Sequence, residues 1–86
     1  MPRICQFYGI TITMYFNDHR PSHFHALYPG YEALIGIETL EVLRGRLPQR
    51  VTALVLEWAS LHRRELRLNW ERAGEGKPLL RIEPLD

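Results

Sequence analysis

Residues 23–37 read His23-Phe24-His25-Ala26-Leu27-Tyr28-Pro29-Gly30-Tyr31-Glu32-Ala33-Leu34-Ile35-Gly36-Ile37, two apolar runs separated by a proline-glycine pair. Such a pair is typical of a tight turn, so the stretch predicts an antiparallel hairpin. If the loop has two residues, Tyr28 pairs with Tyr31, and alternate side chains share a face. One face then carries Phe24, Ala26, Tyr28, Tyr31, Ala33, Ile35 and Ile37, and the other carries His23, His25, Leu27, Glu32, Leu34 and Gly36.

Further strands are predicted on both sides of this hairpin. Residues 3–8 have the composition of a strand and are followed by Gly9, which suits a turn or bulge. Residues 10–16 alternate between apolar and polar types, as expected of a strand that is buried on one side. The apolar set is Ile10, Ile12, Met14 and Phe16, and the other set is Thr11, Thr13 and Tyr15. Residues 41–44 are compatible with one more short strand.

The second half of the chain predicts a long helix. Pro48 suits the first position of a helix, where its missing N–H needs no partner. Apolar residues recur at helical spacing as far as Ala73, and Gly74 and Gly76 are suitable stops. We therefore predict an α+β fold with a small, mostly antiparallel sheet of about four strands packed on one long C-terminal helix. Residues 1–86 are expected to form a single domain, with the strands within 3–45, the helix at about 48–73 and an extended tail at 79–86.

The composition gives limited information about the protein's ligands and its cellular location. The formal net charge is +1, from 11 basic and 10 acidic residues, so charge alone does not favour binding to nucleic acid. A single cysteine, Cys5, rules out an intramolecular disulfide and fits a reducing compartment. The N-terminus lacks the pattern of a secretory leader, and no apolar run approaches the roughly 20 residues that cross a bilayer. We therefore expect a cytoplasmic protein without a membrane partner.

Three of the four histidines fall within residues 17–25, Asn17-Asp18-His19-Arg20-Pro21-Ser22-His23-Phe24-His25. Because residues two apart in a strand point the same way, His23 and His25 should share a face, about 6–7 Å apart at Cα. Asp18 and His19 precede them on a loop and should lie at the rim of that face. Two imidazoles and a carboxylate are a suitable ligand set for a divalent transition metal such as zinc, nickel or iron(II), held by Asp18, His23 and His25.

Two other roles fit the same residues. His19, His23 and His25 are candidate catalytic groups for acid–base chemistry, since histidine titrates near neutral pH. With Arg20 to hold a phosphate, they would suffice for metal-free cleavage of a phosphodiester. In the third interpretation, the histidines only donate hydrogen bonds to the backbone, and Asp18 only stabilises the turn.

His62 lies near the centre of the apolar arc of the predicted helix, beside Trp58 and Leu66. It should therefore face the sheet, where a core histidine usually donates to a backbone carbonyl. Alternatively, His62 completes the histidine cluster if the helix covers the same face of the sheet. The sequence leaves open which face the helix covers. Cys5 has no evident activating neighbour, so a catalytic thiol is not expected.

Several short segments together resemble a known family. They are Phe7-Tyr8-Gly9-Ile10, Met14-Tyr15-Phe16-Asn17-Asp18-His19, Pro21-Ser22-His23-Phe24-His25-Ala26, Tyr31-Glu32-Ala33, Gly45-Arg46-Leu47-Pro48 and Glu57-Trp58-Ala59. In this order they are similar to the short bacterial proteins of domain-of-unknown-function family 4160, over nearly the whole chain. Ser22 departs from the pattern, which usually has a second proline there. The resemblance implies a site at Asp18, His19, His23 and His25.

The resemblance also implies a partner, because members are often encoded beside a second small protein, as in toxin–antitoxin pairs. One hypothesis is therefore an interaction module, one half of a two-protein toxin–antitoxin-like or regulatory system that acts through that partner, with nucleic acid as a further ligand. The alternative is a small histidine-based or metal-dependent enzyme, in the first place an RNase, that uses residues 18–25. A homo-oligomer with a structural role is the third.

Overall fold

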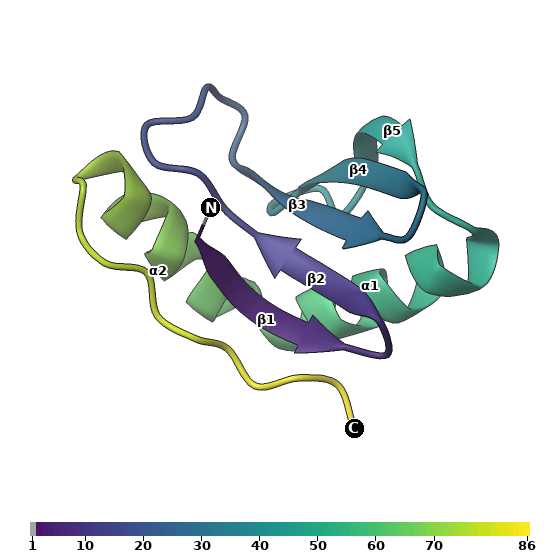
Figure 1. The fold of residues 1–86 in the computed structure, drawn as a ribbon. Coiled ribbons are helices and arrows are strands. Elements are labelled where there is room, and N and C mark those ends of the chain that lie inside the picture. The colour runs from purple at the N-terminus through teal and green to yellow at the C-terminus, as the bar shows by residue number, and fades with distance from the viewer. Residues whose placement is uncertain (1) are drawn as a thin grey trace.

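The computed structural model describes residues 2–86 and contains a five-stranded sheet followed by two helices (Figure 1). The strands are β1 (Arg3–Phe7), β2 (Ile10–Thr13), β3 (His23–Tyr28), β4 (Tyr31–Gly36) and β5 (Val42–Arg46), and the helices are α1 (Gln49–Leu61) and α2 (Arg63–Gly74). The strands lie in the order β1-β2-β3-β4-β5, and every neighbouring pair is antiparallel. The predicted α+β class is thus confirmed, with five strands where about four were expected.

The hairpin of β3 and β4 has the register that the sequence predicts. Tyr28 pairs with Tyr31, and the pairing continues to His23 opposite Gly36. Gly30 has a φ of +83°, a conformation that L side chains rarely adopt, which explains the glycine at this turn. Since the register is as expected, His23 and His25 share one face of the sheet and Phe24 and Ala26 share the other.

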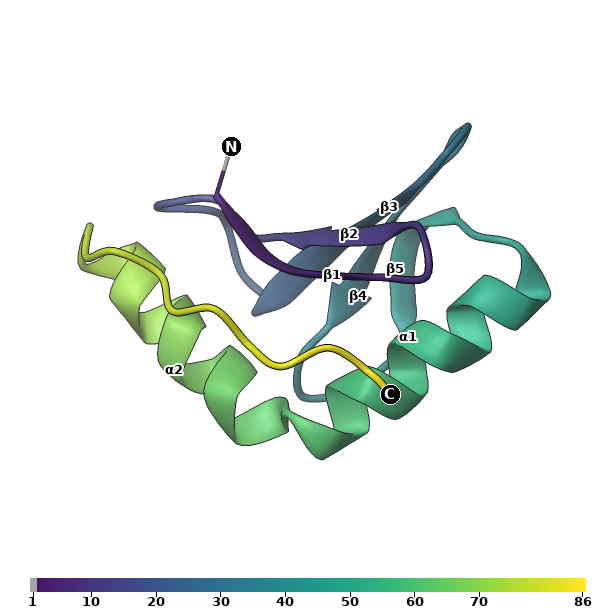
Figure 2. The ribbon, with the colours of Figure 1, turned by 60° about the horizontal axis from the view of Figure 1, so that its bottom comes forward.

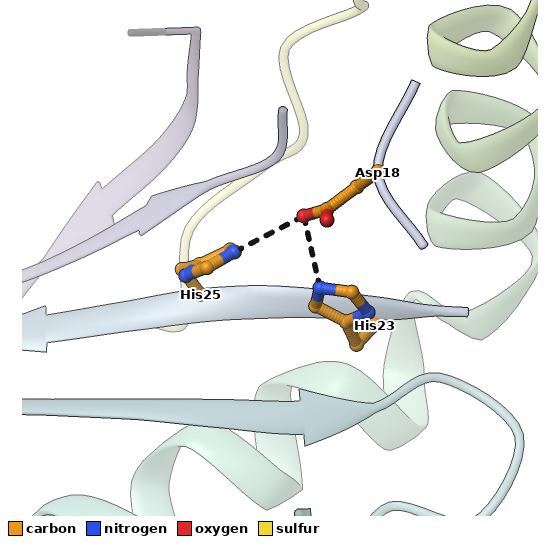
Figure 3. A group of neighbouring side chains, drawn as sticks. All are labelled: Asp18, His23 and His25. Carbon is orange, nitrogen blue, oxygen red and sulfur yellow. Dashed lines mark hydrogen bonds and ion pairs between the residues drawn. The ribbon is translucent and has the colours of Figure 1, made fainter. Parts of the chain in front are cut away.

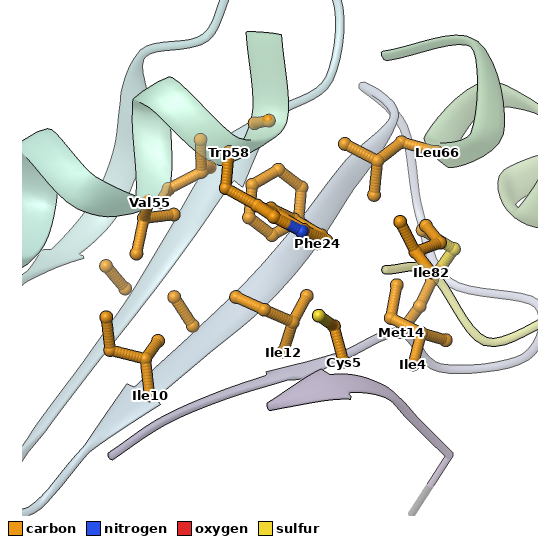
Figure 4. Close-up of a cluster of buried hydrophobic side chains, with 14 of the residues drawn as sticks. Ile4, Cys5, Ile10, Ile12, Met14, Phe24, Val55, Trp58, Leu66 and Ile82 are labelled. Carbon is orange, nitrogen blue, oxygen red and sulfur yellow. The ribbon is translucent and has the colours of Figure 1, made fainter. Parts of the chain in front are cut away.

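The helices cover the Phe24 face, which answers the question that the sequence left open (Figure 2). Trp58 of α1 is fully buried and packs edge-on against Phe24 of β3, with ring centroids 5.8 Å apart. The indole N–H of Trp58 donates to the carbonyl of Glu83 at 2.8 Å. Around this pair lie the other main core side chains, which are Ile4, Cys5, Ile10, Ile12, Met14, Val55, Leu66 and Ile82 (Figure 4).

The single long helix predicted at about 48–73 is wrong, because the helical region divides at His62. That residue has φ −121° and ψ 25°, and α2 continues in a different direction from α1 (Figure 2). A straight helix of 26 residues would be about 39 Å long, whereas the longest dimension of the protein is 33 Å. Dividing the helix lets α1 pack on the sheet while α2 turns towards the loop before β3.

The C-terminal tail is extended, as predicted, and runs beside β1 and the helices (Figures 1 and 2). The N–H of Ile82 donates to the carbonyl of Ile4 at 2.9 Å. The buried side chain of Asn69 in α2 exchanges two hydrogen bonds with the backbone of Leu80, both at 2.8 Å. The tail therefore covers the β1 edge of the sheet without forming a full strand. Among residues 2–86, neither helix has both the length and the apolar character needed to cross a membrane.

The predicted strand at 10–16 ends early, at Thr13. The chain then leaves the sheet, and the backbone N–H of Asn17 donates to the carbonyl of Ala73 at the end of α2, at 3.2 Å. Phe16, expected on the buried face, is 43% exposed for this reason. The loop that carries Asp18 is thus held between the start of β3 and the end of α2.

Candidate metal centre

Asp18, His23 and His25 converge on one point at the end of the sheet where β3 begins (Figure 3). One carboxylate oxygen of Asp18, Oδ2, lies 3.0 Å from Nε2 of His23 and 3.5 Å from Nε2 of His25. The three candidate ligand atoms all lie within 4.8 Å of one another. Ligand atoms around a tetrahedral zinc ion are spaced about 3.3–3.5 Å apart, given bonds of about 2.0–2.2 Å. Small side-chain rotations are therefore enough to close the three groups around an ion.

The ring of His23 is held firmly. Only 1% of its side chain is exposed, and its ring lies 5.3 Å from the indole of Trp70 in α2 and 5.2 Å from the ring of His19. Its Nδ1 faces the carbonyl oxygen of Pro21 at 2.8 Å. If Nδ1–H donates to this carbonyl, Nε2 of a neutral ring is left without hydrogen and presents its lone pair towards Asp18.

The ring of His25 is positioned in the same way. Its Nδ1 lies 3.2 Å from a carboxylate oxygen of Glu32 on β4, and the ring of Tyr15 packs edge-on against it at 4.5 Å. The side chain is 12% exposed. In metal-ligating histidines, one ring N–H usually donates to a carboxylate or carbonyl while the other nitrogen faces the metal ion. His25 has this arrangement, with Nδ1 beside Glu32 and Nε2 towards Asp18.

The four ring nitrogens of this pair all face oxygen acceptors. These acceptors are the Pro21 carbonyl, the Glu32 carboxylate and, twice, the Asp18 carboxylate. A neutral imidazole has a single N–H, so two neutral rings satisfy only two of the four contacts. If each Nδ1–H donates to its own acceptor, the remaining two contacts, both towards Asp18, need positive charge between the nitrogens and the carboxylate. Either extra protons or one divalent cation supplies it.

Asp18 is well suited to be the anion of this group. Its side chain is 19% exposed, and its other oxygen, Oδ1, accepts the backbone N–H of His19 at 2.8 Å. Partial burial raises the pKa of the Asp18 carboxyl, but the His19 N–H and the contacts with His25 and His23 outweigh it, and the pKa is lower than its ordinary value of 3.8. Asp18 therefore remains a carboxylate at neutral pH.

The other two histidines, His19 and His62, are not among the three converging groups. His19 is at the rim as expected, with a 68% exposed side chain and its Nε2 3.7 Å from Oδ1 of Asp18. Asp18, expected at the rim as well, lies instead between the two rings. His62 belongs to the helical layer, where its Nδ1 lies 2.6 Å from the carboxylate of Glu65. That partner is a side chain, whereas a backbone carbonyl was expected. Among residues 2–86, the group of side chains that could hold a metal ion does not include His62.

Two supporting residues were missed in the sequence. The predicted register already places Glu32 on the histidine face, in the next pair on that face after His25 and Leu34, so the sequence pattern could have indicated its role. Trp70 had no such indication, since its contact with His23 depends on where α2 lies. Burial raises the pKa of the Cys5 thiol, an effect that Gln6 and Arg81 only partly offset.

Fold and site together define a small α+β domain in which strand β3 and the preceding loop bring two histidines and one carboxylate together. Residues 9–71 match the sequence model of a family described as domain of unknown function (DUF4160), and the chain belongs to this family. The matched region includes Asp18, His23 and His25. Comparison with curated proteins gave no match. Comparison with solved structures gave none either.

Proposed function

We propose that the protein binds one divalent transition metal ion through Asp18, His23 and His25. The observation that carries the proposal is the excess of acceptors: four ring nitrogens face oxygens, and two N–H groups are available to satisfy them. A divalent cation removes the conflict in one step. It takes both Nε2 lone pairs and the Asp18 carboxylate as ligands, and leaves each Nδ1–H to donate to its own acceptor.

Two nitrogen ligands and one oxygen ligand suit zinc, iron(II) or nickel better than calcium or magnesium, which prefer all-oxygen sites. Three protein ligands also leave at least one coordination position for water or a substrate, as in catalytic rather than structural zinc sites. A metal held in this way polarises an oxygen of a bound substrate. An enzymatic role therefore draws on the same three residues.

Metal content after mild purification tests the proposal directly. We expect close to one zinc, iron or nickel per chain in the wild-type protein, and none in the His23→Ala/His25→Ala variant. His62→Gln is the matched control, because His62 also lies beside a carboxylate but outside the centre. It should retain the metal. Equal metal content in the wild type and the double variant would exclude the centre.

The predicted ribonuclease activity can be measured with the same proteins. If the centre acts on RNA, metal-loaded wild-type protein cleaves a single-stranded oligonucleotide, and the His25→Ala variant does not. His19→Gln separates the two chemistries, because His19 is a candidate acid–base group outside the proposed ligand set. Activity that survives metal removal but is lost in His19→Gln would favour the metal-free mechanism.

Partner binding is a second candidate function, supported by strand β5. All five residues of this edge strand are exposed, and Val42 and Leu43 are 40% and 42% exposed although both are apolar. An open edge strand can pair with a strand of another chain. The small protein expected to be encoded beside this one is the natural candidate. Co-purification of the two, and its loss in a Leu43→Glu variant, tests this role. If the protein stays monomeric both by itself and in a mixture with that candidate, partner binding is excluded.

A further inference from the structure

We propose that a pocket beside the metal centre binds the phosphate group of a small phosphate monoester. The pocket has a volume of about 290 Å³ and lies over the histidine face of the sheet. Its lining combines two arginines, Arg20 and Arg44, with two apolar side chains, Leu34 and Leu43. His19, Pro21 and His23 complete it. This inference rests on the proposed metal site in one respect: His23 belongs to both, so a ligand in the pocket lies beside the metal ligands.

The strand register explains why Arg44 lies next to the centre. His25 of β3 pairs with Leu34 of β4, and Leu34 pairs with Arg44 of β5. Directly paired residues of antiparallel strands share a face, so Arg44 projects from the same face as His25. Arg20 reaches the pocket from the loop before β3. It also lines a second hollow, of about 290 Å³, that contains Asp18, and therefore stands between the two openings.

The charge of the pocket is unbalanced. Neither Arg20 nor Arg44 forms an ion pair within residues 2–86, whereas Arg67 forms a two-bonded pair with Glu38 at 2.7 and 2.8 Å. No aspartate or glutamate of the described chain lines this pocket. Two guanidinium groups around a small cavity match the oxygens of a phosphate, which arginine binds through paired N–H donors.

The volume and the apolar lining of the pocket further restrict the class of ligand that it can bind. About 290 Å³ is at the lower end of the range for small-molecule sites, so the pocket suits a small ester and not a polymer. Leu34 and Leu43 offer apolar surface, which inorganic phosphate cannot use but the carbon part of an ester can. We therefore expect an ester with an apolar or aromatic group to bind more tightly than free phosphate.

Calorimetric titration with phenyl phosphate and with inorganic phosphate, on metal-free protein and on protein loaded with cobalt(II), tests the pocket. Phenyl phosphate should bind both forms, more tightly than inorganic phosphate, and most tightly when the metal is present. Arg20→Gln and Arg44→Gln should each weaken binding about tenfold, since each removes a charge-assisted hydrogen bond. Both arginines are exposed, so these variants should keep the wild-type thermal melt. Arg50→Gln, at an exposed arginine outside the pocket, should bind as the wild type does.

The arms of the experiment separate this proposal from the metal site. Equal affinity of the wild type and the Arg20→Gln/Arg44→Gln double variant would overturn the pocket, with or without metal. Tighter binding of a short RNA than of phenyl phosphate would overturn it too. If cobalt does not bind but phenyl phosphate binding still depends on the two arginines, the metal centre is wrong and the phosphate pocket stands.

Discussion

Both faces of strand β3 bury side chains, but the two faces are built on opposite principles. On the helix side, Phe24 and Ala26 are fully buried among apolar side chains. On the other side, His23 is 1% exposed, yet each of its ring nitrogens faces an oxygen. The first face gains free energy from removing apolar surface from water. The second buries the polar ring of His23, whose nitrogens are matched by a loop carbonyl, by the Asp18 carboxylate and, as we propose, by a metal ion.

The difference shows that the burial of a side chain does not by itself tell whether it belongs to the hydrophobic core or to the candidate functional site. A strand that alternates between aromatic and histidine side chains puts structure on one face and chemistry on the other, because its side chains point alternately to the two faces. The four variants below act on one face or the other, and the two faces should respond differently to metal and to pH.

The largest effect is expected on the helix side. Phe24→Ala should lower the free energy of unfolding by about 3–5 kcal/mol, because it leaves a cavity beside Trp58. Urea denaturation monitored by tryptophan fluorescence measures it. Phe24→Leu, which keeps most of the volume, should cost clearly less. A loss below about 1 kcal/mol for Phe24→Ala would mean that the core does not depend on this contact.

On the histidine side, His25→Ala should remove the stabilisation that metal provides. At a free metal concentration 100 times its dissociation constant, the wild-type protein should gain about 2.7 kcal/mol in its free energy of unfolding. His25→Ala should gain nothing, while its metal-free stability stays near that of the wild type. Denaturation with and without zinc(II) compares the two. An equal gain in both proteins would place the metal elsewhere.

Asp18 should make stability depend on pH in the acid range. Its pKa is lower in the folded protein than its ordinary value of 3.8, so the folded state binds fewer protons there than the unfolded state. The contribution is therefore fully present above pH 3.8 and is lost as the pH falls below it towards the folded pKa. In metal-free protein, Asp18→Asn should cost about 1–2 kcal/mol at pH 6. The gap to the wild type should narrow as the pH falls below 3.8, because the carboxylate is then protonated in the folded protein as well. A gap that stays constant with pH would contradict this account.

Glu32→Gln should have the smallest effect, and only on the affinity for the metal ion. Its carboxylate is half-exposed and orients His25 from behind, so its loss should weaken metal binding about tenfold. The stability of the metal-free protein should be unchanged within error. Competition with a chromophoric chelator measures the affinity, with Glu41→Gln as an exposed control. Unchanged affinity would remove Glu32 from the support of the centre.

The features that could be predicted from the sequence are those that depend on patterns of neighbouring residues. The Pro29-Gly30 pair and the period-two alternation of residues 24–35 determine the hairpin register, and the histidine face follows from it. The helical period over 49–73 was recognised, but not its division at His62, because apolar spacing does not reveal how far a straight helix can extend over a small sheet. The early end of β2 was missed for a related reason, since it depends on the contact between Asn17 and Ala73.

The sequence by itself determined the α+β class, the pairing of β3 with β4 and the shared face of His23 and His25, because these depend on residues a few positions apart. Only the tertiary structure decided that the helices cover the Phe24 face, that Asp18 lies between the two rings and that Trp70 covers His23. Those features depend on packing between segments far apart in the sequence, such as His23 and Trp70, which are 47 positions apart. Such packing is set by the shape of the whole core, and no local pattern records it.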